Sequence, residues 1–195
     1  MNKYTIIAGV NGTGKSSFRG VLEGQGEYLG HIIDPDLIAK NNNFDIFQAG
    51  KQAVSEITNC LKRNISFTQE TTLSGRRIER IAAQSRKQGY YISLYYIGLN
   101  TLAESLQRIE NRVRKGGHDI PKEDVERRFS NRYEALEKIL PYCDEVSFYD
   151  NENGFVKVGE IRNNRFSFIN GYRPQWLISL TKQIQSHADF DIHFE

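Results

Sequence analysis

Short apolar runs alternate with amphipathic segments along most of this 195-residue chain. Runs rich in β-branched or aromatic residues predict buried strands, and they cover Tyr4–Val10, His31–Asp34, Ile65–Thr72, Tyr90–Leu99 and Glu145–Asn151. Apolar residues at helical spacing predict helices over Lys15–Gly24, Phe44–Asn64, Arg76–Gln88, Thr101–Lys115 and Lys122–Tyr142. Strands that are apolar on both faces and separated by helices indicate a parallel sheet that is covered on both sides.

The last part of the chain follows a different pattern. The apolar segments 155–161 and 165–170 flank Arg162–Asn164, which predicts a β-hairpin outside the parallel core. Pro174 is expected to open a final helix that runs to about His187. No repeat, low-complexity tract or linker divides the sequence. The pattern therefore predicts a single α/β domain over residues 1–195, with three α/β/α layers, a central mostly parallel sheet, and a C-terminal hairpin plus helix.

Composition narrows the class of protein. The chain is 38% hydrophobic and 26% charged, as expected of a globular domain. Its 26 basic and 24 acidic residues balance too closely to indicate a nucleic-acid partner. Cys60 and Cys143 lie far apart, which fits small buried hydrophobic residues better than a zinc or disulfide framework. No apolar run approaches the roughly 20 residues that span a membrane, and the N-terminus is unlike a secretory signal, so we expect a cytoplasmic protein.

A phosphate-binding motif follows the first predicted strand. The stretch "GVNGTGKS", residues 9–16 (the phosphate loop), fits G-x-x-x-x-G-K-[ST] between a strand and a helix. Backbone N–H groups of such a loop and the helix N-terminus attract phosphate oxygens. We expect Lys15 to reach the outer phosphates and Ser16 to offer its hydroxyl to Mg²⁺. The residues predicted to hold ATP are Gly9, Asn11, Gly12, Thr13, Gly14, Lys15, Ser16 and Ser17.

Two aspartates stand on either side of Pro35, where the second predicted strand ends. Ligands of parallel sheets bind at the carboxyl ends of strands, so both acids lie near the expected γ-phosphate. A carboxylate there can accept the proton of an acceptor hydroxyl or hold Mg²⁺ through water. Asp34 or Asp36 can instead cap the helix that starts near Leu37. We do not expect both to be only caps, and Asp34 is assigned either to the metal shell or to structure.

The third predicted strand ends in "QETTLSG", residues 69–75. Glu70 is placed to bind a substrate hydroxyl or the water shell of the metal. Thr71 and Thr72 can hydrogen-bond the same substrate, and Ser74 is predicted to cap the next helix.

Basic residues concentrate around "GGHDIP", residues 116–121. Between 108 and 132, eight basic side chains face five acidic ones, and seven of the eight are Arg108, Arg112, Arg114, Lys115, Arg127, Arg128 and Arg132. Two helices joined by a glycine-rich hinge predict a lid over about 108–132 that closes on phosphate. The alternative is a solvated helical face, but an Arg108–Arg112 pair repels unless an anion lies between. His118 is either a lid hydrogen-bonding group or a turn residue.

The motifs that accompany the phosphate loop indicate a kinase. We identify no convincing run of four apolar residues that ends in "DE" and no guanine-reading "NKxD", which a motor protein or GTPase would require. Small-molecule and nucleotide kinases need only the loop, an acid near the second strand, a substrate wall and a basic lid.

In this order, "GVNGTGKS", "IDPD", "ETTLSG" and "GGHDIP" resemble the stand-alone zeta-toxin-like P-loop kinases, from about Tyr4 to Asn151. Zeta toxins phosphorylate the sugar of UDP-N-acetylglucosamine and so poison peptidoglycan synthesis. The resemblance implies that Asp36 is the base and that Glu70 contacts the acceptor. It also implies that lid arginines stabilise the transferring phosphoryl group; we favour Arg112, Arg127 and Arg128, with Arg114 a close rival.

The expected function is therefore an ATP- and Mg²⁺-dependent phosphotransferase with a P-loop kinase-like fold. It would act on a small-molecule hydroxyl, with UDP-N-acetylglucosamine or a related nucleotide-sugar as leading acceptor. The alternatives are a nucleoside, nucleotide or RNA-end kinase, and a non-catalytic ATP-dependent switch. An antitoxin, if one exists, would be a separate chain. Asp150 and Asn151 are expected near the adenine, and Asn151 is counted among the ATP-binding residues.

Overall fold

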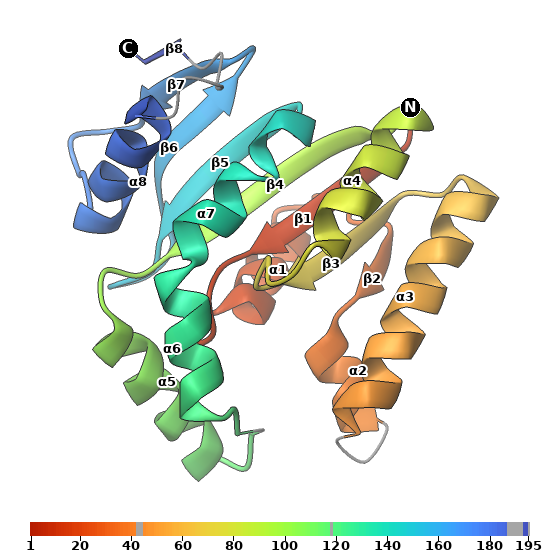
Figure 1. Ribbon diagram of the computed structural model, residues 1–195, viewed down its shortest axis with the longest axis horizontal. Helices are drawn as coiled ribbons and strands as arrows, with labels where there is room; N and C mark the ends of the chain where they lie inside the picture. Colours follow the sequence, from red (N-terminus) through yellow and green to blue (C-terminus); the bar gives the residue numbers. More distant parts are fainter. Residues whose placement is uncertain (42–44, 118, 187–192, 195) are drawn as a thin grey trace.

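The computed structural model describes residues 1–41, 45–117, 119–186 and 193–194. A single sheet runs through this part of the chain in the order β2-β3-β1-β4-β5-β6-β7-β8 (Figure 1). The strands are β1 Lys3–Ala8, β2 His31–Ile33, β3 Phe67–Thr71, β4 Tyr91–Gly98, β5 Glu145–Asp150, β6 Val156–Arg162, β7 Arg165–Phe168 and β8 His193–Phe194. Strands β2, β3, β1, β4 and β5 are parallel, whereas β6 and β7 are antiparallel additions.

Helices cover both faces of this sheet. They are α1 Lys15–Gly24, α2 Pro35–Asn41, α3 Ile46–Arg63, α4 Arg77–Lys87, α5 Leu102–Arg114, α6 Lys122–Ser130, α7 Arg132–Glu137 and α8 Gln175–Ser186. On one face, Phe18 and Leu22 of α1 pack with Ile7 and Ile97. On the other face, a larger apolar cluster joins the sheet to α3, α4, α7 and α8, of which α4, α7 and α8 stand in front of the sheet in Figure 1. The predicted three-layer α/β fold with a mostly parallel sheet is confirmed.

The C-terminal hairpin is formed by β6 and β7. Its turn residues Asn163 and Asn164 have φ values of 50° and 58°, which suit a tight turn with left-handed residues. Strand β6 pairs antiparallel with β5, so the hairpin lies outside the parallel core, as predicted, and extends the same sheet. Among the described residues, no helix combines the length and apolar character needed to cross a bilayer.

The single helix predicted over Lys122–Tyr142 is wrong. Asn131 leaves helical geometry (φ −92°, ψ 7°) and separates α6 from α7, which ends at Glu137. Residues Leu140–Tyr142 form a short 3₁₀ turn, η1, instead. Pro141 explains this ending, because proline lacks an N–H group and disfavours helical geometry in the residue before it.

Two helices follow β2, as the sequence pattern predicted. Pro35 takes the first position of α2, where proline is well tolerated. The helix predicted over Phe44–Asn64 corresponds to α3, which begins at Ile46 after Asp45; the Asp45 side chain accepts from the Gln48 N–H at 2.9 Å. Residues 42–44 lie outside the described part of the chain.

Candidate active site

The phosphate loop begins at Gly9, directly after β1, and leads into α1. Gly9 has φ 153°, and a Cβ added there would lie 2.4 Å from the Ile97 carbonyl oxygen. The Lys15 ammonium donates to the carbonyls of Gly9 (2.9 Å) and Val10 (3.2 Å), and so lies across the mouth of the loop. Burial lowers the pKa of Lys15, and nearby carboxylates, chiefly that of Asp36, oppose this effect.

Neighbouring elements hold the loop in shape. Ser105 of α5 donates its hydroxyl to the Asn11 carbonyl at 2.6 Å, and Arg128 of α6 donates to the Asn11 side-chain oxygen at 3.0 Å. The Asn151 amide, just beyond β5, donates to the Thr13 carbonyl at 2.8 Å. Asn11, Thr13 and Asn151 thus take part in hydrogen bonds that shape the loop, and their predicted contacts with ATP stay a prediction. The predicted adenine contact of Asn151 stays a prediction.

Glu70, near the end of β3, is 4% exposed and lies beside the first turn of α1. The Ser16 hydroxyl donates to its Oε2 at 2.8 Å. Arg19 Nη1 forms ion pairs with Glu70 Oε1 at 2.9 Å and with Asp34 Oδ2 at 3.4 Å. The contact with Glu70 Oε1 lacks hydrogen-bond geometry. Burial and then Asp34 raise the pKa of Glu70, while Ser16, Arg19 and Lys15 act against that rise.

The two aspartates around Pro35 differ in what they contact. Asp34 Oδ1 accepts from the N–H groups of Asp36 (3.0 Å) and Leu37 (3.2 Å), and Oδ2 pairs with Arg19. Both oxygens of Asp34 are thus engaged, one in a helix cap and the other in an ion pair. These contacts fit the structural alternative for Asp34, and its place in the metal shell stays a prediction. Asp36, in the first turn of α2, is exposed.

Two cavities meet at this position. The first, of about 320 Å³ (the loop cavity), is lined by Asn11, Gly12, Gly14, Lys15, Ser16, Ser17, Asp36, Glu70, Arg108, Ile109 and Arg112. The second, of about 220 Å³ (the strand-end cavity), is lined by Asn11, Lys15, Asp34, Pro35, Asp36, Gln69, Glu70, Thr71, Thr72 and Arg128. The residues common to both are Asn11, Lys15, Asp36 and Glu70. Asp36 therefore lies on the boundary between the phosphate loop and the ends of the strands.

The end of β3 and the following Thr72 line the strand-end cavity, but Ser74 does not cap the next helix. The Thr71 hydroxyl accepts from the Leu73 N–H at 3.0 Å, and the hydroxyls of Thr72 and Ser74 lie 2.9 Å apart. The residue before α4 is Arg76, which makes no side-chain cap hydrogen bond. The capping predicted for Ser74 is therefore wrong, because the chain continues for two residues before α4 begins.

The arginines around the predicted lid separate into two groups. Arg112 lines the loop cavity, and Arg128 lines the strand-end cavity. Arg127 pairs with Asp124 at 2.5 Å and lines neither of these cavities, and the exposed Arg114 pairs with Glu110 at 2.7 Å. The structure thus brings Arg112 to the loop cavity and Arg128 to the strand-end cavity. Arg127 lines a neighbouring cavity together with Thr72 and Arg128, and its predicted role stays a prediction. His118 lies outside the described residues.

Two further arginines lie at the site: Arg108, which was predicted only as part of the lid, and Arg19, which was not predicted. Arg108 donates to the carbonyls of Asn151 (2.5 Å) and Glu152 (3.3 Å) and lines the loop cavity. Arg19 pairs with both Asp34 and Glu70. Its position three residues after Ser16 on a helix was the available signal, since residues at that spacing share a helical face.

Solved structures with a similar fold include a chain of AvrRxo1-ORF1:-ORF2 with ATP, with a TM-score of 0.64, 16% identity, and coverage of 94% of this chain and 63% of that one. A chain of the PezAT chromosomal toxin-antitoxin system of Streptococcus pneumoniae has a TM-score of 0.60, 15% identity, and coverage of 94% and 84%. A chain of the Pnkp1/Rnl/Hen1 RNA repair complex has a TM-score of 0.55, 20% identity, and coverage of 70% and 46%. The present chain spans just under two thirds of the AvrRxo1 chain. These likenesses show a zeta-toxin-like P-loop kinase fold.

A protein of Haemophilus influenzae (strain Rd), named only as an uncharacterized protein, is 34% identical over 133 residues, which are 66% of this chain and 93% of that protein. The chain belongs to the same family as this protein. No family model matches the sequence.

Proposed function

We propose that the protein is an ATP- and Mg²⁺-dependent phosphotransferase that acts on a hydroxyl of a small molecule. One observation carries this proposal: Asp36 lines both the loop cavity and the strand-end cavity. A phosphate donor in the first and an acceptor in the second would meet beside its carboxylate. Transfer between two bound groups gains most of its rate from such juxtaposition, provided that a base is within reach of the acceptor proton.

Each residue of the site has a part in this reaction. Loop N–H groups and Lys15 hold the outer phosphates of ATP. Arg112 and Arg128 stabilise the charge on the transferring phosphoryl group from the two cavities. Asp36 accepts the proton of the acceptor hydroxyl while that oxygen bonds to the γ-phosphorus. The bond between the γ-phosphorus and the β,γ-bridging oxygen breaks, and ADP leaves.

The residues at the base of the loop cavity fit a magnesium ion. Mg²⁺ prefers oxygen ligands and takes one or two protein groups together with phosphates and waters. The Ser16 hydroxyl and the Glu70 carboxylate are paired at 2.8 Å and both line this cavity. Bound there, the ion would offset negative charge on the phosphates. We therefore propose that Glu70 belongs to the water shell of the metal, in preference to an acceptor contact.

The acceptor and the partner are proposed from resemblance. A nucleotide-sugar, with UDP-N-acetylglucosamine first, is supported by the zeta-toxin-like motifs and by the likeness to PezAT. An RNA-end kinase is supported by the likeness to a chain of an RNA repair complex, and a nucleoside or nucleotide kinase and a non-catalytic switch are further alternatives. A separate antitoxin-like partner is supported by the likeness to a chain of an AvrRxo1-ORF1:-ORF2 complex and to a chain of the PezAT toxin-antitoxin system.

The test is Asp36→Asn. Because the amide cannot take the hydroxyl proton, we expect transfer to fall by roughly 10²- to 10⁴-fold while ATP binding is kept. The measurement is ADP and phosphorylated product formed from ATP and Mg²⁺ with UDP-N-acetylglucosamine, a nucleoside or 5′-hydroxyl RNA as acceptor. Circular dichroism and ATP titration confirm that the variant folds and binds.

Glu27→Gln is the matched control, since it also removes one carboxylate but lies at an exposed position outside both cavities. It should leave turnover unchanged. Near-wild-type turnover by Asp36→Asn would show that Asp36 is not the general base. ADP that forms only when a partner protein is added would favour the switch over the kinase.

A further inference from the structure

Arg19 of α1 pairs with two carboxylates beside the ends of β2 and β3. Its Nη1 atom lies 2.9 Å from Glu70 Oε1 and 3.4 Å from Asp34 Oδ2. Arg19 follows Ser16 by three residues and therefore lies on the same face of α1. It lines neither the loop cavity nor the strand-end cavity, so its influence on a ligand there passes through the carboxylates that it holds.

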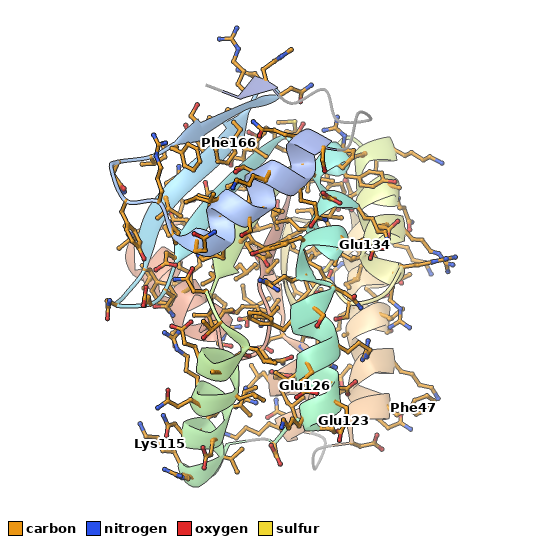
Figure 2. The ribbon with its side chains drawn as sticks, turned by 60° about the vertical axis from the view of Figure 1, so that its left-hand side comes forward. Phe47, Lys115, Glu123, Glu126, Glu134 and Phe166 are labelled. Atoms are coloured by element: carbon orange, nitrogen blue, oxygen red, sulfur yellow. The ribbon has the colours of Figure 1, made fainter. Side chains whose placement is uncertain are left out.

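The ion pairs of Arg19 are shielded from solvent. The Arg19 side chain is 18% exposed, and those of Glu70 and Asp34 are 4% and 7% exposed. By contrast, Figure 2 shows Glu126 on α6 and Glu134 on α7, whose side chains pair with lysines but are 44% and 62% exposed. Water and salt screen such surface pairs, which therefore contribute little. Loss of the shielded guanidinium would instead leave two carboxylates side by side without their shared cation.

Arg19 offsets the repulsion between Glu70 and Asp34. The nearby Asp34 carboxylate raises the pKa of Glu70, whereas Arg19 lowers it. Main-chain N–H groups at the start of α2 hold Asp34 in place, while Glu70 accepts a hydrogen bond from the Ser16 hydroxyl. Without Arg19, we expect the repulsion to move the Glu70 side chain, and with it the oxygen that faces Ser16.

We propose that Arg19 is a positioning residue that holds the Glu70 carboxylate in the orientation needed to bind the water shell of Mg²⁺. The ion pair with Arg19 engages Oε1, which leaves Oε2 directed at the Ser16 hydroxyl, and both Glu70 and Ser16 line the loop cavity. Groups that orient a metal-binding carboxylate from outside contribute about 10- to 100-fold to metal affinity or activity. This inference rests on the proposed function and adds a residue that acts without touching ATP, metal or acceptor.

The first experiment measures metal binding without turnover. Equimolar protein and a non-hydrolysable ATP analogue are titrated with Mn²⁺, a paramagnetic substitute for Mg²⁺, and the protein-bound complex is followed by water proton relaxation. Arg19→Met keeps an unbranched side chain but removes the charge, so we expect the affinity for Mn²⁺ to fall by about 10- to 100-fold. Arg19→Lys keeps the charge without the planar fork and should recover part of the loss.

Two variants serve as controls for this titration. Glu23→Gln removes the half-exposed carboxylate that lies 3.8 Å from Arg19 Nε and should leave the affinity for Mn²⁺ unchanged. Arg86→Met removes an arginine from an ion pair with Asp144 at the last turn of α4 and should also leave it unchanged. Equal affinity for Mn²⁺ in Arg19→Met and the wild type overturns the positioning role. An equal loss in Arg86→Met overturns it too, because the effect would then come from general stability.

The second experiment asks whether Arg19 acts through Glu70. In a Glu70→Gln background, Arg19→Met should change the affinity for Mn²⁺ by less than about twofold, because the carboxylate that Arg19 orients is absent. The Glu70→Gln substitution also removes the repulsion with Asp34, so this double variant is expected to fold even if Arg19→Met alone does not. A further loss of about tenfold or more in the double variant overturns the inference.

Phosphate transfer separates this inference from the proposed function. With the acceptor that yields product in the panel above, Arg19→Met should raise the Mg²⁺ concentration that gives half the maximal rate, with the KM of the acceptor unchanged. If no acceptor yields product, the proposed function fails, while the Mn²⁺ titration still decides the role of Arg19. Wild-type protein that binds no Mn²⁺ together with the ATP analogue overturns both.

Discussion

The two oxygens of Glu70 face different partners, the Ser16 hydroxyl and the Arg19 guanidinium. Neither contact fully offsets burial and the nearby negative charge of Asp34, so the pKa of Glu70 is raised above its ordinary value of 4.5. A carboxyl group of this kind binds its proton more tightly in the folded protein than in the unfolded chain. Ionisation of the Glu70 carboxyl group is therefore unfavourable in free energy unless a cation lies near it.

Glu70→Gln tests the raised pKa of Glu70 through the free energy of unfolding. Because the folded pKa is raised, the stabilisation from Glu70 is complete below pH 4.5 and is lost as pH rises through the folded pKa. The free energy of unfolding of the wild type should therefore fall relative to that of Glu70→Gln between acidic and neutral pH. Urea unfolding of both proteins without nucleotide or metal measures the difference.

Glu134→Gln is expected to change the pH dependence of the free energy of unfolding in the opposite direction. Glu134 is exposed, and its hydrogen bond with Lys138 lowers the pKa of the carboxyl group. Its contribution is present above the ordinary pKa and is lost as pH falls, so this variant should differ most from wild type at neutral pH. A Glu70→Gln difference that is independent of pH, or that follows Glu134→Gln, would contradict the buried state assigned to Glu70.

Among the elements, α5 connects most parts of the site. Thr101 and Glu104 form a capping box at its start. The Ser105 hydroxyl donates a hydrogen bond to the Asn11 carbonyl of the phosphate loop. A Cβ at Gly12 would lie 2.8 Å from the Ser105 carbonyl oxygen, so the helix backbone packs directly on the loop. The predicted lid is thus made of two unlike helices: α5 is docked on the loop through its backbone, and α6 reaches the loop through the Arg128 side chain.

Thr101→Ala tests the anchoring of α5. Loss of the cap leaves the Glu104 N–H without its side-chain acceptor, and the free energy of unfolding should fall by about 1 kcal/mol in urea titration. Thr101→Ser keeps the hydroxyl and should stay close to wild type. If both substitutions cost the same, the loss comes from the Thr101 methyl group and not from the cap.

Across the whole molecule, the C-terminal segments connect to the phosphate loop. Trp176 of α8 donates its indole N–H to Asp150 at 2.7 Å, and its ring leaves no room for a side chain at Gly98. Asp150 precedes Asn151, which bonds to the loop at Thr13. The hairpin and α8, which carry none of the predicted site residues, therefore help to position the edge of the nucleotide site.

Trp176→Phe tests this connection. The variant keeps an aromatic ring but leaves the buried Asp150 without its indole donor, which should cost about 1–3 kcal/mol of unfolding free energy and raise the KM of ATP. Trp176 is the single tryptophan of the chain, so we also expect ATP binding to change the tryptophan fluorescence of the wild type. Tyr172→Phe removes longer contacts to Asp150 (3.4 Å) and Glu152 (3.2 Å) and should have a smaller effect. Unchanged ATP binding by Trp176→Phe would contradict the connection.

The sequence by itself determined the parallel core and the phosphate loop. Both depend on residues that are close in the chain: apolar runs of strand length, and a glycine pattern that sets local backbone geometry. The predicted position of Asp36 beside the loop also followed from local order, because parallel strands place their carboxyl ends at one edge.

Only the tertiary structure decided which charged side chains meet. Arg127 and Arg128 are consecutive, but an α-helix turns about 100° per residue, so packing decided that Arg128 reaches Asn11. Asp34 and Asp36 look equivalent in sequence. Because α2 begins at Pro35, Asp34 caps this helix, and Asp36 lines the loop cavity and the strand-end cavity. Arg19 and Arg108 reached the site only because α1 and α5 converge there, and no local sequence pattern determines how such distant segments pack.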